Sequence, residues 1–345
     1  MPIRSLSALT ALLHVYIALR LLPALAMLTP AWPLALAALA ISALTIPLPF
    51  VSRGKERGAS AGELLQWTGL ISMGWFSSLF VSTLLRDAGL LLAWLASVLF
   101  GAPLPWHAVL PWSAMAVLVL ATLVSMVGFL NARRTADVKR VEVPIRGLPA
   151  ALEGFTIAQL SDIHVGPTIR SAYIQRIVDA VNRLGADAIA ITGDLVDGSV
   201  AELREHIAPL AGLRAKHGTF VVTGNHEYYA GAHAWIDELR RLGLKVLLNE
   251  HVVLQTRNVR GAQNDEELFE SQLVLAGVTD YTAGHFDAAH ASDPHLALFD
   301  APPLVHTRVL LAHQPRSATL AAQAGYQLQL SGHTHGGQFF PWNLF

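Results

Sequence analysis

The fold of the second half of this chain is decided by one run of residues, Ala188-Ile189-Ala190-Ile191-Thr192-Gly193-Asp194-Leu195-Val196-Asp197. It begins with a continuous apolar run, 188–192, that is typical of a buried strand. Glycine then opens a loop that carries two carboxylates, Asp194 and Asp197. Acidic turns after strands are common and are usually just solvated. The run therefore indicates a functional site only if other strands end in the same way.

Four other predicted strands do end in the same way, with His, Asp or Asn within three residues of the strand. These strands are predicted over residues 155–160, 219–223, 308–312 and 326–330. Helices are predicted between them over residues 169–184, 201–213, 232–242 and 317–324. Strands that alternate with helices predict a largely parallel sheet with right-handed crossovers. In such a sheet, ligands gather at the carboxyl ends of the strands.

The rest of the second half carries weaker patterns. An edge strand that can accept a proline is predicted over 141–145, and further strands over 246–248, 252–254 and 273–278. Residues 257–267 are polar and predict a loop, and residues 279–303 predict a long loop over the site with room for a short helix. Three histidines of that long loop are candidates for substrate contact, and four histidines elsewhere are predicted to be ordinary surface residues. The loop residues are His285, His290 and His295, and the surface residues are His206, His217, His233 and His251.

Composition divides the chain near residue 130. The 345 residues include no cysteine and carry a formal net charge of −1. The sequence therefore excludes disulfides and thiolate metal sites, and its charge gives no sign of a nucleic-acid partner. Residues 1–130 hold only six of the 24 Lys and Arg residues and two of the 15 His residues. We predict a multi-pass transmembrane domain over 1–130, a basic linker over 131–140 and a soluble domain over 141–345.

Membrane spans are predicted from apolar stretches of about 20 residues. Four stretches fit, at residues 6–28, 32–51, 64–85 and 107–130. A fifth, 88–105, is shorter and could be re-entrant or interfacial, so four spans are favoured and five stay open. Two other interpretations also stay open, namely a cleaved signal peptide at the N-terminus and buried helices of a soluble protein. Arg20 interrupts the first stretch, and packing against a neighbouring helix or snorkelling is favoured over a lipid or ion contact.

Basic residues predict which membrane face carries the soluble domain. One cluster lies between the second and third stretches, and the other follows the last stretch. The first comprises Arg53, Lys55 and Arg57, and the second comprises Arg133, Arg134, Lys139 and Arg140. If both clusters are cytoplasmic, an even number of crossings separates them. That pattern favours four spans and a cytoplasmic soluble domain, at the inner membrane if the source is bacterial, whereas five spans would place it outside.

The residues that follow the five strands offer oxygen and imidazole nitrogen without sulfur. Residues i and i+2 of an extended segment share a face, so Asp162 and His164 can reach one metal together. This ligand type suits manganese, iron or zinc better than calcium or magnesium. The number of candidate ligands suits two divalent ions about 3.5–4 Å apart, the spacing used for hydrolysis of phosphate esters.

Two runs carry a resemblance to a known family, Gln159-Leu160-Ser161-Asp162-Ile163-His164 and Gly332-His333-Thr334-His335-Gly336-Gly337-Gln338. With Gly224-Asn225-His226-Glu227, this set resembles the calcineurin-like metallophosphoesterase superfamily over residues 141–338, and especially the branch often tethered to bacterial membranes. The resemblance implies an α/β fold, a four-layer αββα sandwich, preceded here by an all-α transmembrane bundle. Members usually continue through further strands, so the end at Phe345 predicts a C-terminally short domain.

The resemblance also implies a role for each site residue. Seven residues would be metal ligands: Asp162, His164 and His335 on one ion, Asn225, His313 and His333 on the other, and Asp194 on both. A hydroxide between the ions would attack phosphorus in line, and His226, oriented by Asp197, would donate a proton to the leaving oxygen. A carboxylate bonded to an imidazole fixes its tautomer and raises its basicity, which agrees with these roles. Tyr228 and Tyr229 follow the acid and either line the substrate site or pack the turn.

The sequence therefore predicts a membrane-anchored, dinuclear phosphoesterase, a phosphodiesterase or pyrophosphatase rather than a protein phosphatase. The tether suggests a lipid-linked phosphate as the substrate and the lipid bilayer as a partner, by analogy alone. A membrane sensor or scaffold that binds metal without turnover is the first alternative, and a transporter with an appended regulatory domain is the second. The complete ligand set argues against the first, and the scarcity of charges inside the spans argues against the second.

Overall fold

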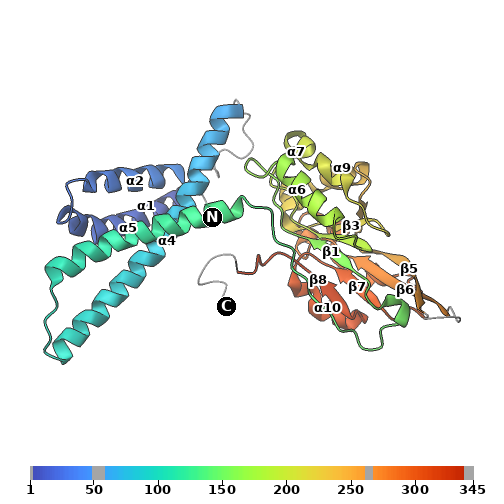
Figure 1. Cartoon of the computed structure of the whole chain (residues 1–345). Coiled ribbons are helices and arrows are strands. Elements are labelled where there is room, and N and C mark those ends of the chain that lie inside the picture. Colours follow the sequence, from blue (N-terminus) through green and yellow to red (C-terminus); the bar gives the residue numbers. More distant parts are fainter. Residues whose placement is uncertain (1–2, 49–58, 261–266, 338–345) are drawn as a thin grey trace. The chain divides into compact units, whose positions relative to one another are not determined.

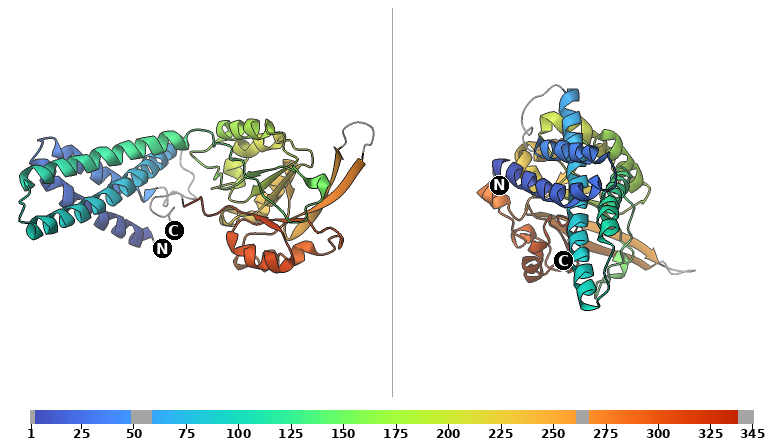
Figure 2. Two further views of the ribbon diagram at one scale, coloured as in Figure 1. Left: turned by 60° about the horizontal axis from the view of Figure 1, so that its bottom comes forward. Right: turned by 90° about the vertical axis from the view of Figure 1, so that its left-hand side faces the viewer.

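The chain divides into two compact units, Met1–Arg134 and Thr135–Phe345. The computed structural model describes residues 3–48, 59–260 and 267–337, which Figures 1 and 2 colour along the sequence. Within those residues the first unit consists of helices, and the second combines two sheets with helices. The functional residues all belong to the second unit.

The first unit contains α1 (Ile3–Ala26), α2 (Trp32–Thr45), α4 (Ala59–Leu99) and α5 (Trp106–Ala132). Three stretches within them are long and apolar enough to cross a membrane, namely Ser7–Ala26, Leu64–Leu99 and Trp106–Ala132. Helix α2 has 14 residues, fewer than the about 20 that a span needs, and residues 49–51 of the predicted second span lie outside the described residues. Residues 88–99 continue α4 without a break, so they do not form a separate segment.

A charged network surrounds Asp87 within α4. Arg20 of α1 donates Nε to Asp87 Oδ2 at 2.7 Å and Nη2 to Asp87 Oδ1 at 3.0 Å. Tyr16 donates its hydroxyl to the same carboxylate at 2.6 Å, and Arg86 donates Nε to Ser113 of α5 at 2.9 Å. Arg20 thus packs against a neighbouring helix, as predicted, and the network joins α1, α4 and α5.

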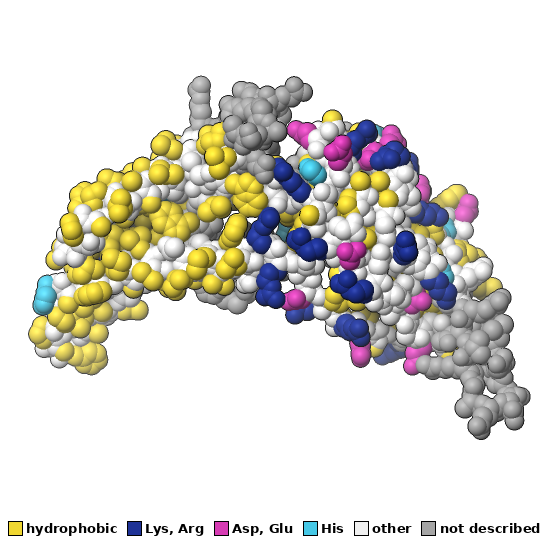
Figure 3. All heavy atoms as spheres, turned by 45° about the horizontal axis from the view of Figure 1, so that its top comes forward, with side chains coloured by type: hydrophobic (Ala, Val, Ile, Leu, Met, Phe, Trp, Pro, Cys, Tyr) yellow, Lys and Arg dark blue, Asp and Glu magenta, His cyan; other side chains and the backbone are white. Residues whose placement is uncertain are grey.

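The surface of the helical unit is apolar. Hydrophobic side chains, yellow in Figure 3, dominate the visible face of this unit, whereas Lys, Arg, Asp and Glu crowd the visible face of the other unit. Leu19, Leu34 and Leu99 are 69–78% exposed. Apolar surface on this scale is expected of lipid-facing helices and not of the core of a soluble protein.

Two four-stranded sheets form the centre of the second unit. The first holds β1 (Ile157–Leu160), β2 (Ala188–Thr192), β3 (Thr219–Val222) and β4 (Lys245–Val246), in that order and all parallel. The second holds β5 (Glu250–Arg260), β6 (Glu267–Gly277), β7 (Arg308–Leu311) and β8 (Leu328–Leu330). Among the described strands, β5 and β6 alone pair antiparallel, so the predicted parallel arrangement holds for the other neighbours.

The buried strand β2 shows how the layers stack. Ile189 and Ile191 pack among residues of α6 (Ser171–Asn182), α7 (Val200–Ile207) and α9 (Ala232–Arg241), which cover the first sheet. Ala188 and Ala190 point to the opposite face and pack against the second sheet. The far face of that sheet packs against α10 (Ala318–Ala324). These four layers are the predicted αββα sandwich, and each fully buried Ile contributes about 1.5–3 kcal/mol to it.

Two predicted elements were wrong. Residues 141–145 form no strand, and Val141 is 78% exposed. The described residues of the predicted loop over 257–267 are strand, because β5 runs to Arg260 and β6 begins at Glu267. The antiparallel register pairs residues 250–260 with residues 267–277 along their whole length, so the polar run at the end of β5 belongs to a strand pair and polarity did not indicate a loop there. Residues 261–266 lie outside the described residues.

The remaining predicted elements changed only in detail. The predicted helix 201–213 divides into α7 and a 3₁₀ helix, Ala208–Gly212, at Pro209, because proline cannot donate a helical hydrogen bond. The long loop 279–303 is confirmed and contains three 3₁₀ turns of three residues each.

Candidate active site

The predicted site residues all follow the carboxyl ends of β1, β2, β3, β7 and β8. In the first sheet these ends share one edge because its strands are parallel. Hydrogen bonds join the two sheets at this edge. Gln159 donates Nε2 to the Ser331 carbonyl at 2.9 Å, and His313 places Nδ1 2.8 Å from the Thr192 carbonyl. The edge therefore brings together segments that lie more than a hundred residues apart in the sequence.

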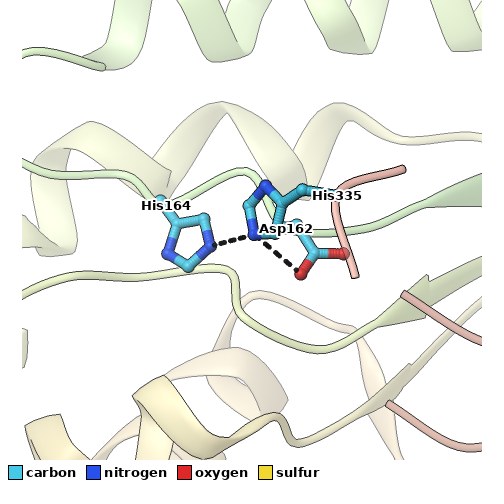
Figure 4. Close-up of side chains that lie close together, drawn as sticks. All are labelled: Asp162, His164 and His335. Carbon is cyan, nitrogen blue, oxygen red and sulfur yellow. Dashed lines mark hydrogen bonds and ion pairs between the residues drawn. The ribbon is translucent and has the colours of Figure 1, made fainter. Parts of the chain in front are cut away.

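The first group of side chains comprises Asp162, His164 and His335 (Figure 4). His335 Nε2 lies 3.2 Å from His164 Nε2 and 3.4 Å from Asp162 Oδ1. The three donor atoms lie within 4.8 Å of one another. One cation can therefore contact all three.

The second group comprises Asp194, His313 and His333. Asp194 Oδ2 lies 3.1 Å from His313 Nε2, which in turn lies 3.1 Å from His333 Nδ1. Burial disfavours the charged form of His313, but the hydrogen bond and charge of Asp194 prevail and raise its pKa to about 9. The buried Asp194 carboxylate thus requires a positive partner, a role that a protonated imidazole or a metal ion fills. Asp194 also forms a group with His164 and His226, so it belongs to more than one set of donors.

Asn225 supplies an independent test of whether a metal fits. The residue is 8% exposed, and its Oδ1 has no hydrogen-bond partner. A buried polar atom without a partner is costly, so this oxygen requires a ligand that the chain does not provide. The adjacent His226 donates its backbone N–H to Asp194 Oδ1 at 2.9 Å, which places Asn225 beside the second group. Carboxylate, amide and imidazole donors together fit divalent transition metals.

Asp197 lies between two imidazoles. One carboxylate oxygen makes a short hydrogen bond with His226 Nδ1, and the other lies 3.3 Å from His164 Nδ1. Burial alone would raise the pKa of Asp197, but its contacts with the imidazoles of His164 and His226 hold that pKa well below the ordinary value. The hydrogen bond with Asp197 raises the pKa of His226. The contact with His164 was not foreseen from the sequence, and it makes Asp197 a support for both histidines.

The backbone at this edge is strained. Among the described residues, seven other than glycine have positive φ, and five of them are candidate metal ligands. These five are Asp162 (54°), His164 (51°), Asp194 (52°), His333 (72°) and His335 (49°). The left-handed conformation costs roughly 1–2 kcal/mol for such residues. Strain that gathers on the same residues as the donor atoms indicates a site maintained for function rather than for stability.

Three glycines make the close approach of these segments possible. A Cβ on Gly193 would lie 2.7 Å from the Gly224 nitrogen and 2.8 Å from His313 Nδ1. A Cβ on Gly224 would collide with the Asp194 side chain and backbone, and one on Gly332 with Ser161 and Asp162. The glycine in each motif therefore provides space for the donor groups.

Glu227 is a functional residue whose role was missed. It is 2% exposed and accepts backbone N–H groups from the turn after β2 and from the start of α8 (Asn225–Ala230). The donors are Asp194 at 3.0 Å, Leu195 at 2.7 Å, Val196 at 3.3 Å and Gly224 at 2.6 Å. Its position three residues after Gly224, at the first turn of a helix, was the available signal.

The loop 279–303 reaches the candidate acid. The ring of Tyr229 lies 5.5 Å from His226 and 5.6 Å from Phe286 of the loop. Of the three loop histidines, His290 places Nδ1 2.9 Å from the Tyr228 hydroxyl. Of the four predicted surface histidines, His233 is exposed, whereas His206, His217 and His251 are half-buried.

Comparison with known proteins agrees with this geometry. The family description Calcineurin-like phosphoesterase matches residues 155–337, more than half of the chain. The chain belongs to this family. Members of this family are phosphoester hydrolases that generally use divalent metals, and the individual ligand roles predicted above stay predictions.

The relatives of this chain include two that are named as transmembrane proteins with the same domain. The chain is 40% identical over 265 residues to a transmembrane protein with metallophosphoesterase domain from Bos taurus, covering 75% of this chain and 58% of the relative. A protein of the same name from Danio rerio is 36% identical over 65% of this chain and 50% of its own length. An uncharacterized metallophosphoesterase from Campylobacter jejuni is 32% identical over 66% of this chain and 55% of its own length. The chain thus spans about half the length of these relatives.

The alignment to the Bos taurus protein is longer than the second unit, so it extends into the helical unit. The helical unit that this alignment reaches holds the three stretches that are long and apolar enough to cross a membrane.

Proposed function

We propose that this metallophosphoesterase is a dinuclear enzyme that hydrolyses a phosphodiester or pyrophosphate bond, on a substrate linked to lipid. The observation that carries the proposal is the position of Asp194, which shares donor groups with His313 and His333 on one side and with His164 and His226 on the other. A carboxylate in that position can contact two ions at once. Two ions side by side are the arrangement used for in-line displacement at phosphorus.

The residues proposed to hold the ions are those named from the sequence. One ion would be held by Asp162, His164 and His335, the other by Asn225, His313 and His333, with Asp194 shared. When bound, such ions supply Lewis acidity toward phosphoryl oxygens and toward water. Manganese, iron and zinc all fit the donor set.

His226 is the proposed general acid. Its Nδ1 is occupied by Asp197, so the other ring nitrogen, Nε2, is the atom from which a proton would pass to the leaving oxygen. Asp197 fixes the tautomer and stabilises the protonated ring. Because the hydrogen bond with Asp197 raises the pKa of His226, the ring keeps the proton that this role needs. Tyr229, which is 65% exposed beside His226, would contact the leaving group.

The lipid-linked substrate and the membrane face are further parts of the proposal. A catalytic unit tethered by transmembrane helices meets substrates anchored in a bilayer without a search through solution. The basic clusters at 53–57 and 133–140 flank α4 and α5, and two crossings return the chain to the same face. The positive-inside rule then favours a cytoplasmic catalytic unit. Because the chain has no cysteine, an introduced Arg140→Cys can be tested for labelling by an impermeant maleimide.

The decisive experiment uses the full chain in detergent, loaded with manganese. Two diesters are compared, one with a para-nitrophenyl leaving group and one with an alkyl leaving group, beside a monoester. Asp194→Asn is expected to lose metal and activity. His226→Ala is expected to keep metal and to lose about 10²–10⁴ in rate, with the larger loss on the alkyl substrate, which needs a proton more.

His206→Ala on α7 is the matched control, and it should leave metal content and rate unchanged. Full activity in both site variants contradicts the proposed chemistry. Metal binding without turnover of any phosphoester would favour the sensor or scaffold alternative instead.

A further inference from the structure

A further group of side chains that could bind a metal lies outside the residues assigned above. It comprises His233 at the start of α9 with Asp287 and His290 of the loop 279–303, and we call it the His233 cluster. Its three donor atoms lie within 4.8 Å of one another. From these contacts we propose that the His233 cluster binds a zinc ion, which clasps the loop onto α9 independently of the catalytic centre.

The donor atoms converge as they do in the candidate catalytic groups. His233 Nε2 lies 3.0 Å from Asp287 Oδ2, and the rings of His233 and His290 lie 4.9 Å apart. The distance between His313 and Asp194 is similar, at 3.1 Å. Two imidazoles and one carboxylate, with solvent at a fourth position, are an established zinc ligand set.

Both loop residues are held by neighbours in a way that leaves donor atoms available. Asp287 Oδ1 accepts the Ala289 backbone N–H at 2.9 Å, which leaves Oδ2 facing His233. His290 Nδ1 lies 2.9 Å from the Tyr228 hydroxyl oxygen. When Nδ1 carries the proton and donates it to that oxygen, Nε2 keeps the lone pair that a metal requires. Such a partner for the second ring nitrogen is usual for metal-bound histidine.

The position of the cluster gives the clasp a consequence. Phe286, immediately before Asp287, packs against Tyr229, whose ring lies against the candidate acid His226. Tyr228 is buried and connects His290 to the helix that bears His226. An ion bound by the His233 cluster would therefore fix the loop residues that lie beside the acid.

Zinc content tests the proposal directly. The full chain in detergent is loaded with zinc, desalted and analysed for bound metal, as wild type and as His233→Gln, Asp287→Asn and His285→Gln. His233 is exposed, so its replacement is expected to leave the fold intact. Each cluster variant should hold one zinc fewer per chain than wild type, whereas His285→Gln, an exposed histidine of the same loop, should match wild type.

Asp194→Asn is measured alone and combined with His233→Gln to separate the two sites. The losses of bound zinc in the two single variants should add in the double variant. If Asp194→Asn removes no zinc, that result counts only against the dinuclear proposal, and His233→Gln should still remove one zinc. Equal zinc content in wild type and in both cluster variants overturns the zinc site.

Proteolysis gives a readout that does not depend on activity. Phe286 is 53% exposed and is a chymotrypsin site beside the cluster. Zinc should slow cleavage there several-fold in wild type and in His285→Gln but not in His233→Gln. Equal protection of all three proteins would show that zinc acts elsewhere and would overturn the clasp.

Discussion

Glu227 holds the backbone of Asp194, whose N–H donates to Glu227 Oε2 at 3.0 Å. The same carboxylate accepts the Gly224 N–H at 2.6 Å, so a single buried side chain joins the turns after β2 and β3. Burial and the nearby Asp194 raise the pKa of Glu227 to about 7, against the opposing effect of the backbone donors. Glu227 is therefore a positioning residue, since it fixes the backbone of Asp194, the ligand proposed to be shared by two ions, without facing the substrate.

Replacing Glu227 should damage the site through its support. Glu227→Ala leaves four backbone donors without their acceptor, and each buried unpaired donor costs about 1–3 kcal/mol. We expect a lower unfolding temperature and loss of bound manganese, with a smaller effect for Glu227→Gln, which keeps one oxygen. Thermal unfolding and metal analysis measure both effects. Glu205→Ala, an exposed position on α7, is the control, and a Glu227→Ala protein with normal stability and metal content contradicts the role.

Asp197 should set the alkaline limit of activity. The hydrogen bond with Asp197 raises the pKa of His226. A general acid works only when protonated, so the rate falls as the pH rises through that pKa. Asp197→Asn removes the anion, lowers the pKa of His226 and should move the alkaline limb of the kcat/KM profile to lower pH.

The profile is measured on the alkyl diester, for which proton donation matters most. Asp179→Asn, an exposed carboxylate on α6, should leave it unchanged. If the alkaline limb of Asp197→Asn stays at the wild-type pH, Asp197 does not set the pKa of the general acid.

Gly224 should tolerate no side chain. Its φ is −103°, which any residue adopts, so the cost of Gly224→Ala comes only from the collision of the new Cβ with Asp194. We expect Gly224→Ala to lose bound metal and activity. Gly212→Ala is the matched control, because its Cβ would meet only Val178 at an ordinary 3.4 Å. The metal content of the purified proteins measures the effect. Normal metal binding by Gly224→Ala would contradict the prediction, because it would mean that the turn carrying Asp194 can move to accommodate the new Cβ.

The framework of the site could be predicted because its signals are local. The run 188–192 is β2 to the residue, and the residues that follow the other four strands lie where the parallel order of the strands places them. A strand end is defined by an apolar run followed by a polar residue, and both lie within a few positions. Strand pairing then brings distant segments to one edge without further information from the side chains.

The parts that escaped prediction depend on partners far away in the sequence. Asp197 contacts His164, and Glu227 accepts backbone N–H groups from the turn after β2. These long-range contacts have no local signature, although the spacing of Gly224 and Glu227 at the start of α8 is a local signal. The positive φ values of the candidate ligands follow from the site as a whole, not from residue type. His233 lies more than fifty residues from Asp287, so it resembled an ordinary surface histidine.

The Arg20–Asp87 pair should hold the helical unit together. The two residues are 67 positions apart and join α1 to α4 through two charged hydrogen bonds, which are worth on the order of 2 kcal/mol each. Asp87→Leu leaves Arg20 and Arg86 without their anion and should lower the thermal stability of the helices in detergent. The double variant Arg20→Met/Asp87→Leu removes one of the uncompensated charges and should recover part of that loss. Ser125→Ala, which removes a neutral contact with Ser78, is the control and should cost less. Circular dichroism on heating measures all four proteins, and equal losses in the single and double variants would show that the charges are not coupled.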